Sequence, residues 1–87
     1  MISNEFIKAL VKLRRNERNL TQHKLGELSG TCGSQVGRLE RCGYISPSPM
    51  YRVMKYLGLL KEYGEWMKQT HPKNYQNWLG WDWDDEL

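Results

Sequence analysis

The sequence contains no long run of apolar residues, and its first residues lack a basic stretch followed by an apolar core. A helix that crosses a membrane needs about 20 mostly apolar residues in a row. A secretory signal peptide needs a basic start followed by an apolar core. We therefore expect a cytoplasmic protein with no membrane segment and no signal peptide.

Cysteine and histidine are scarce, with two of each. Cys32 and Cys42 fall near opposite ends of one predicted helix, which rises about 1.5 Å per residue and so separates them too far for a disulfide. We expect both to be reduced thiols. His23 and His71 have no paired C-x-x-C spacing beside them, which argues against a zinc site. The sequence also shows no pair of nucleophile and base and no phosphate loop, so we predict no enzyme, no metal and no cofactor.

Length and charge limit the protein to one small domain with an appendage. The 87 residues are too few for two hydrophobic cores. The net charge of +3 hides a split: residues 1–60 contain ten Lys and Arg against four Glu, whereas residues 61–87 contain three Lys against six Asp and Glu. Basic charge on a small domain is typical of a phosphate-binding surface, and solvated surface cations are the alternative.

The first predicted helix carries an apolar stripe that we expect to face the core. Ser3 or Asn4 is its cap, because either side chain can accept a hydrogen bond from an unpaired backbone N–H. The stripe has the spacing i, i+4 and i+7 and consists of Phe6, Leu10 and Leu13. We expect it to pack on the pair of helices that follows.

The next stretch of the sequence predicts two short helices joined by a tight turn. Thr21 can cap the first of them, and Gly30 provides the left-handed residue at which the chain reverses. We place the second helix at residues 32–41. The apolar positions expected to face the core are Leu25 and Leu28 in the first helix and Val36 and Leu39 in the second.

These positions also carry a resemblance to a known family. The matching residues are Leu20-Thr21-Gln22, Leu25, Leu28-Ser29-Gly30, Val36 and Arg38-Leu39-Glu40, within a set of spacings from Leu10 to about Leu59. In this pattern the chain resembles the helix-turn-helix of the phage repressor and Cro family, also called the XRE family. Thr31 stands where the family has an apolar turn residue, and Cys32 where it has a Ser or Thr cap. If Thr31 is the cap, the second helix begins one residue earlier than in the family.

The resemblance implies an all-α, lambda-repressor-like bundle of four to five short helices that binds double-stranded DNA. Residues 1–60 would be the DNA-binding domain, with the helix of residues 32–41 in the major groove. Gln35 is suited to a bidentate pair with adenine and Arg38 to one with guanine. The base-reading residues predicted in this way are Gly33, Ser34, Gln35, Gly37 and Arg38. The two glycines would permit close approach of the backbone or of a thymine methyl group.

Phosphate contacts are expected at the two ends of this unit. At the start of the helix capped by Thr21, the free backbone N–H groups favour an anion. In the resembled family, the loop after the next helix lies along the DNA backbone. The predicted phosphate-contacting residues are Gln22, Lys24, Arg41, Tyr44 and Ser46. For the loop, an ordinary connection with Ile45 in the core is an equal alternative.

The resemblance also implies an ion pair between the glutamate that ends the recognition helix and an arginine of the first helix. Here the glutamate is Glu40. If this helix is aligned with the family by its apolar stripe, the partner of Glu40 is Arg14. If it is aligned by its distance from Thr21, the partner is Arg15. We favour Arg14.

A further helix is predicted to begin after Ser48, with Pro49 at its first position, and to end at Gly58. A proline is tolerated there because the first helical N–H has no partner within the helix. The side chains expected in the core are Met50, Val53, Met54 and Leu57.

Residues 61–87 combine a last helix, to about Thr70, with an aromatic and acidic tail. The helix either completes a five-helix domain or meets its copy in a second subunit. We favour a homodimer, because the aromatic residues exceed what a small core needs. The predicted interface with a second subunit or a partner protein consists of Tyr63, Trp66, Met67, Tyr75, Trp78, Trp81 and Trp83. A tail that only covers the last helix is an equal alternative.

The sequence therefore predicts a sequence-specific transcriptional regulator, most simply a dimeric repressor that reads an inverted repeat in double-stranded DNA. A phage or another mobile element would encode it, and it would act in a bacterial cytoplasm or a phage-infected cell. Two alternatives stay open. One is an antitoxin-like or controller protein whose tail binds a partner protein, and the other is a protein-interaction adaptor without a specific DNA site.

Overall fold

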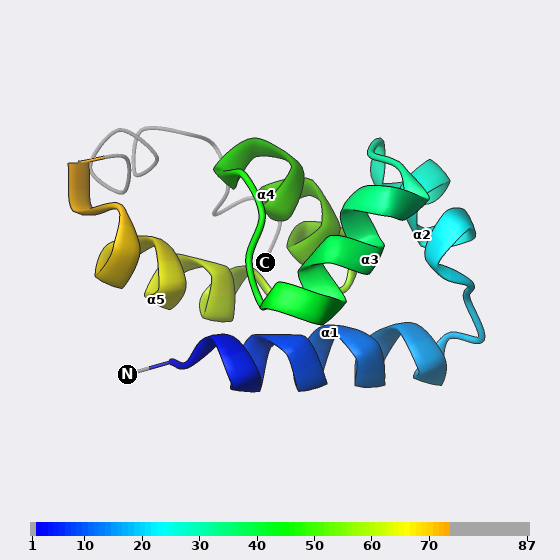
Figure 1. The fold of residues 1–87 in the computed structure, drawn as a ribbon, viewed down its shortest axis with the longest axis horizontal. Helices are drawn as coiled ribbons and strands as arrows, with labels where there is room; N and C mark the ends of the chain where they lie inside the picture. Colours follow the sequence, from blue (N-terminus) through cyan, green and yellow to red (C-terminus); the bar gives the residue numbers. More distant parts are fainter. Residues whose placement is uncertain (1, 74–87) are drawn as a thin grey trace.

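The computed structural model describes residues 2–73, which form five α-helices and, over that range, no strand (Figure 1). The helices are α1 (Asn4–Glu17), α2 (Gln22–Ser29), α3 (Gly33–Cys42), α4 (Pro47–Tyr56) and α5 (Leu60–Thr70). The all-α class predicted from the sequence is confirmed. In this part of the chain, no helix has the length and apolar character needed to cross a membrane.

Side-chain caps begin the first two helices where the sequence predicts them. The Ser3 hydroxyl accepts a hydrogen bond from the Phe6 N–H at 3.0 Å, and the Thr21 hydroxyl accepts one from the Lys24 N–H at 3.0 Å. At the other end of α2, Gly30 has a φ of 79°, the left-handed conformation that glycine adopts without steric cost. The predicted end of this helix at Gly30 is confirmed.

One hydrophobic core joins all five helices. Its buried side chains are Ile7, Val11, Leu25, Val36, Leu39, Ile45, Met50, Val53, Met54, Leu57, Leu59, Leu60, Tyr63, Trp66 and Met67. The core positions predicted for α3 and α4 are all among them. Both helices show a single apolar spacing in the sequence, which leaves no competing choice of inner face.

The stripe predicted for α1 is wrong by one residue. Phe6 and Leu13 are 48% and 54% exposed, whereas Ile7 and Val11 are fully buried and Leu10 is partly buried. Both sets have helical spacing, so periodicity in α1 alone does not separate them. The packing of α1 against α3 selects the face that carries Ile7 and Val11.

Helix α4 begins two residues earlier than predicted. Ser46 occupies the cap position and Pro47 the first helical position, so that Pro49 also falls within the first turn. The first turn of a helix needs no N–H donors, and it therefore accepts both prolines. The helix ends at Tyr56, just before Gly58, which has a φ of 74°.

Helix α5 completes the core of this chain. Tyr63, Trp66 and Met67 are all buried against the other helices. The interface predicted for these three residues is therefore wrong, because their side chains do not reach the surface. The remaining predicted interface residues, Tyr75, Trp78, Trp81 and Trp83, lie outside the described residues.

Tyr63 links α5 to the start of α4. Its hydroxyl donates a hydrogen bond to the Pro47 carbonyl oxygen at 3.0 Å, and its ring packs edge-on against Tyr51 with 5.7 Å between the ring centroids. Burial, with a smaller contribution from Tyr51, raises the pKa of Tyr63 above its ordinary value. The neutral phenol is therefore the form that the folded chain holds.

We expect Tyr63→Phe to lower the free energy of unfolding by about 1 kcal/mol at neutral pH, because one buried hydrogen bond is lost. Above pH 10.0, the ordinary tyrosine pKa, the unfolded chain releases the Tyr63 proton while the folded chain retains it, so the wild type loses stability as pH rises. Tyr63→Phe should lack this part of the alkaline loss. Urea unfolding followed by circular dichroism at pH 7 and pH 10.5 measures both effects. Tyr44→Phe, at an exposed tyrosine, is the control, and equal stability of both variants at pH 7 would contradict the prediction.

Candidate nucleic-acid interface

Helices α2 and α3 approach each other closely because α2 contains a glycine. A Cβ atom at Gly26 would lie 2.3 Å from the carbonyl carbon of Cys32, and the Gly26 carbonyl oxygen accepts a hydrogen bond from the Thr31 N–H at 2.8 Å. No side chain fits between the two backbones. Gly26 is not among the residues predicted from the sequence, although a glycine inside a short predicted helix indicates such an approach.

Leu28 takes a different place from the one predicted. It was expected in the core one turn after Leu25, but it is 44% exposed, whereas Leu25 is fully buried. Gly26 is buried instead, against the start of α3. The inner face of α2 is therefore rotated toward α3, because the close contact at Gly26 sets the orientation of the helix.

Cys32, and not Thr31, occupies the cap position of α3. The helix runs over Gly33–Cys42, one residue later at each end than the predicted 32–41. The Cys32 thiol is exposed and lies 3.2 Å from the Ser34 hydroxyl. This hydrogen bond, with the backbone N–H of Gln35, lowers the pKa of the Cys32 thiol.

The outward face of α3 carries polar and cationic side chains. Ser34, Arg38 and Arg41 are exposed at the spacing i, i+4 and i+7, and Gln35 is half-buried beside them. Val36 and Leu39, on the opposite face, are buried. The structure therefore brings together three of the predicted base-reading side chains, those of Ser34, Gln35 and Arg38.

The two glycines predicted on this face lie against α2 instead. A Cβ atom at Gly33 would be 3.0 Å from the Cα atom of His23. At Gly37 it would be 3.2 Å from Oε1 of Gln22 and 3.3 Å from Nη1 of Arg41, and Gly37 is buried. Because glycine has no side chain, both positions allow α3 to pack closely on the first turn of α2.

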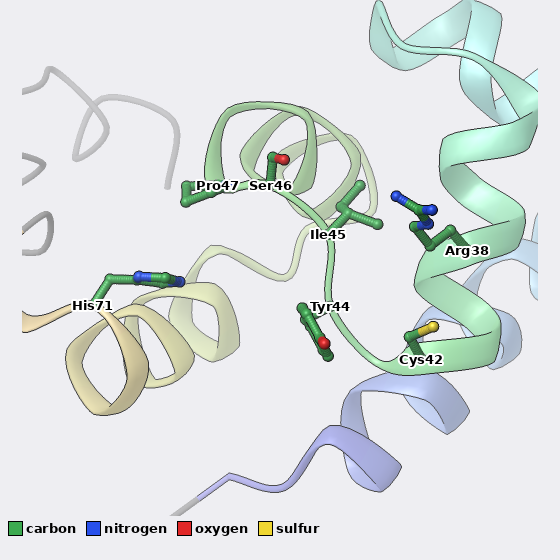
Figure 2. Close-up of a pocket in the computed structure, with 7 residues that line it drawn as sticks. All are labelled: Arg38, Cys42, Tyr44, Ile45, Ser46, Pro47 and His71. Carbon is green, nitrogen blue, oxygen red and sulfur yellow. The ribbon is translucent and has the colours of Figure 1, made fainter.

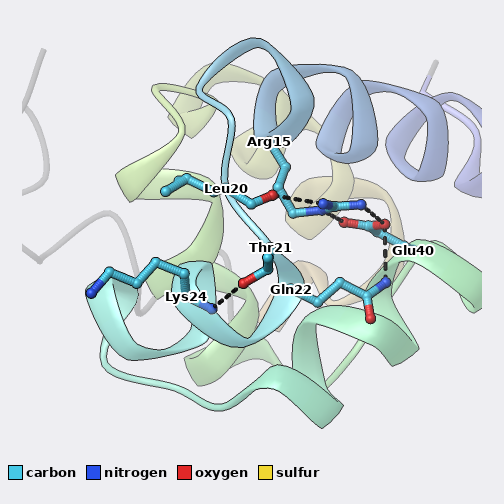
Figure 3. Close-up of polar contacts among 6 residues, drawn as sticks. All are labelled: Arg15, Leu20, Thr21, Gln22, Lys24 and Glu40. Atoms are coloured by element: carbon cyan, nitrogen blue, oxygen red, sulfur yellow. Dashed lines mark hydrogen bonds and ion pairs between the residues drawn. The ribbon is translucent and has the colours of Figure 1, made fainter.

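An ion pair between Arg15 and Glu40 ties α1 to the inner side of α3 (Figure 3). Arg15 Nε lies 2.6 Å from Glu40 Oε2, and Arg15 Nη2 lies 3.0 Å from Glu40 Oε1. Both side chains are largely buried, with 12% and 6% of their surface exposed. The hydrogen bond to Glu40 also raises the pKa of Arg15, against the opposing effect of burial.

The favoured partner of Glu40, Arg14, is therefore wrong. Arg15 follows Ile7 and Val11 on the buried face at steps of four residues. The prediction of Arg14 depended on the other stripe of α1, which is not the buried one. Arg14 points to the end of α4, where its Nη1 donates to the Leu57 carbonyl oxygen at 3.4 Å.

The same carboxylate fixes the first turn of α2. Gln22 Nε2 donates to Glu40 Oε1 at 3.2 Å, and Arg15 Nη1 donates to the Leu20 carbonyl oxygen at 2.7 Å (Figure 3). Side chains of three helices thus meet at Glu40, and Arg15 also holds the α1–α2 connection. Gln22, predicted to contact phosphate, has its amide engaged with α3.

Two other arginines of the basic domain also serve the fold. Arg18 Nη1 donates to the Tyr56 carbonyl oxygen at 2.6 Å, and Arg52 Nη1 donates to the Gly30 carbonyl oxygen at 3.3 Å. Such contacts satisfy carbonyl groups that a helix end leaves without a partner. The two guanidinium groups are therefore hydrogen-bonded to the C-terminal ends of α4 and α2.

Arg38 and Arg41 differ from these arginines. Both are exposed, and within residues 2–73 neither forms an ion pair or a hydrogen bond. Lys24, in the first turn of α2, is also exposed, at 3.8 Å from Glu27. Arg38 and Arg41 thus give the outward face of α3 two positive charges that are exposed to solvent.

In the loop after α3, the apolar side chain packs in the core and the polar side chains beside it are exposed to solvent. Ile45 is buried, whereas Tyr44 and Ser46 on either side of it are exposed. Gly43 has a φ of 85° and lies so close to Asn4 that no Cβ atom would fit. Ile45 thus lies in the core, as the alternative of an ordinary connection has it, and the same alternation leaves the hydroxyl groups of Tyr44 and Ser46 exposed.

We expect Arg15→Met to lower the free energy of unfolding by roughly 3 kcal/mol, because it leaves the largely buried Glu40 carboxylate without its partner. Arg14→Met is the matched control and should cost about 1 kcal/mol, since it removes one long, partly buried hydrogen bond and a solvent-exposed ion pair with Glu17. Urea unfolding of the two variants measures the difference. A larger loss for Arg14→Met would show that the ion pair is misassigned.

We expect Gly26→Ala to destabilise the fold by roughly 1–3 kcal/mol, because the added methyl group would press on the backbone at Cys32. Gly37→Ala places a methyl group against the movable side chains of Gln22 and Arg41, so its cost is offset by a gain in helix propensity of about 1 kcal/mol. Thermal unfolding compares the two. An equal loss for both substitutions would contradict the close α2–α3 contact.

Within residues 2–73, no group of three His, Cys, Asp or Glu side chains is placed to hold a metal ion. The chain matches no protein-family model, and comparisons with curated proteins and with solved structures give no match either.

Proposed function

We propose that α2 and α3 form a helix-turn-helix unit that binds double-stranded DNA, and that the protein is a sequence-specific transcriptional regulator. The observation that carries the proposal is the outward face of α3, where Ser34, Arg38 and Arg41 project to solvent. The Arg15–Glu40 ion pair and the close contact at Gly26 hold this helix rigidly from behind.

The dimensions of α3 suit the major groove. A helix with its side chains is about 10–12 Å wide, and the groove is about 12 Å wide. Arg38, in the middle of the helix, reads guanine through a bidentate pair, and Gln35 reads adenine in the same way. Each such pair discriminates against a wrong base by roughly 1–3 kcal/mol.

Contacts to phosphate position the helix in the groove. Arg41 at the end of α3, together with Tyr44 and Ser46 in the following loop, binds one strand of the backbone. The Ser46 hydroxyl is not used as a cap for α4, which leaves it for this role. Lys24, at the start of α2, binds on the other side of the helix.

A repressor of this kind acts as a homodimer that reads an inverted repeat with half-sites about 10 bp apart. Selection of double-stranded DNA from a randomised pool at moderate salt tests the proposal. Enrichment of an inverted repeat supports it. Binding without enrichment contradicts it and favours a protein-interaction adaptor.

We expect Arg38→Ala to relax the preference at one base pair of the selected site, because a base-reading side chain is removed. Arg41→Ala should weaken binding to all sequences alike and reduce the salt dependence by about one phosphate contact. Lys68→Ala removes one exposed charge from α5 and is the control. Fluorescence-anisotropy titrations against single-base variants of the site measure each effect. Uniform weakening by both arginine substitutions would exclude Arg38 as a base reader.

A further inference from the structure

A surface cavity of about 490 Å³ lies beside the outward face of α3. It is lined by Arg38 and Cys42 from α3, by residues 44–46 of the following loop, by Pro47 at the start of α4, and by His71 just after α5 (Figure 2). Figure 2 shows Arg38 and His71 on opposite sides of the loop. The cavity therefore joins the proposed base-reading arginine to the point at which the chain leaves α5.

The cavity offers three kinds of contact. Arg38 supplies a cation that has no ion-pair partner within residues 2–73. Tyr44 and Ser46 supply hydroxyl groups, and Ile45 and Pro47 supply apolar surface. Such a lining suits a ligand that combines carboxylates with flat aromatic groups, since cations attract both.

The end of the chain has this combination. Residues 74–87 contain four acidic residues and no Lys or Arg, whereas residues 2–73 contain 13 Lys and Arg against six Glu. The two parts thus have net charges of −4 and +7. The acids alternate with indole rings in Trp81-Asp82-Trp83-Asp84.

The attachment point brings this segment to the cavity. His71 lines it, and the ring of His71 is held edge-on against the buried Trp66 at 5.2 Å between ring centroids. Asp82 follows His71 by eleven positions, and an extended chain over eleven residues reaches up to about 35 Å. A short tether of this kind gives an effective concentration in the millimolar range.

We propose that residues 74–87 bind in this cavity of the same chain, with their carboxylates at Arg38 and their indole rings on Tyr44 and Pro47. The consequence for DNA binding rests on the proposed function: the segment competes with DNA for Arg38. It suppresses binding that depends on charge alone more than binding that also gains base contacts. The acidic end thereby raises selectivity.

The docking itself is tested without DNA, by ¹H–¹⁵N NMR spectra of the full chain. The variant Asp82→Asn/Asp84→Asn/Asp85→Asn/Glu86→Gln removes the four charges and keeps the aromatic rings. We expect its amide signals to differ from the wild type at Arg38, Cys42 and residues 44–46, independently of protein concentration. Differences confined to residues 71–87 would overturn the proposal, as would differences that appear only at high concentration and so report a second copy of the chain.

The effect on DNA binding is measured with a duplex that lacks the selected site, at fixed salt. We expect the tail variant to bind about tenfold more tightly than the wild type, because an intramolecular competitor is removed. The control, Glu5→Gln/Glu17→Gln/Glu62→Gln/Glu65→Gln, changes the net charge by the same amount on α1 and α5 and should gain much less. An equal gain in both variants would overturn the proposed competition. If no variant binds DNA, the proposed function fails and the NMR comparison still decides whether the segment docks.

Discussion

The orientation of α3 depends on the ion pair between Arg15 and Glu40. A carboxylate with little exposed surface is costly unless its oxygens are paired, and Glu40 accepts hydrogen bonds from both Arg15 and Gln22. These bonds join α1, the first turn of α2 and the inner side of α3. The opposite side of α3 is left with Ser34, Arg38 and Arg41 in solvent. A charged interaction inside the domain thus determines which charges face outward.

The arginines of the domain are divided between two tasks. Arg14, Arg18 and Arg52 donate to carbonyl oxygens at or just beyond the ends of α4 and α2, where helical hydrogen bonding stops. Arg38 and Arg41 have no such partners among the described residues. The net charge of this part of the chain therefore overstates the number of cations available to bind nucleic acid. The proposed interface depends on the few cations that the fold does not use.

Features that depend on neighbouring residues alone were mostly predicted correctly. The cap at Thr21, the end of α2 at Gly30 and the apolar residues buried in α3 and α4 follow from spacing and local hydrogen bonding. The cap of α1 is Ser3, one of the two residues predicted for it. In α1 two apolar stripes were available, and the wrong choice led directly to Arg14. The glycines at 33 and 37 were assigned to a DNA surface because a missing side chain does not say which neighbour comes close.

The sequence by itself determined that the chain forms short amphipathic helices, because helical periodicity and capping are properties of neighbouring residues. It also determined that the basic charge lies in residues 1–60 and the acidic charge at the other end. Only the tertiary structure decided which face of α1 is buried, which arginine meets Glu40, and that Tyr63, Trp66 and Met67 fill the core. These choices depend on contacts between residues far apart in the chain, such as Arg15 with Glu40 and Tyr63 with Pro47, and no local pattern encodes their partners.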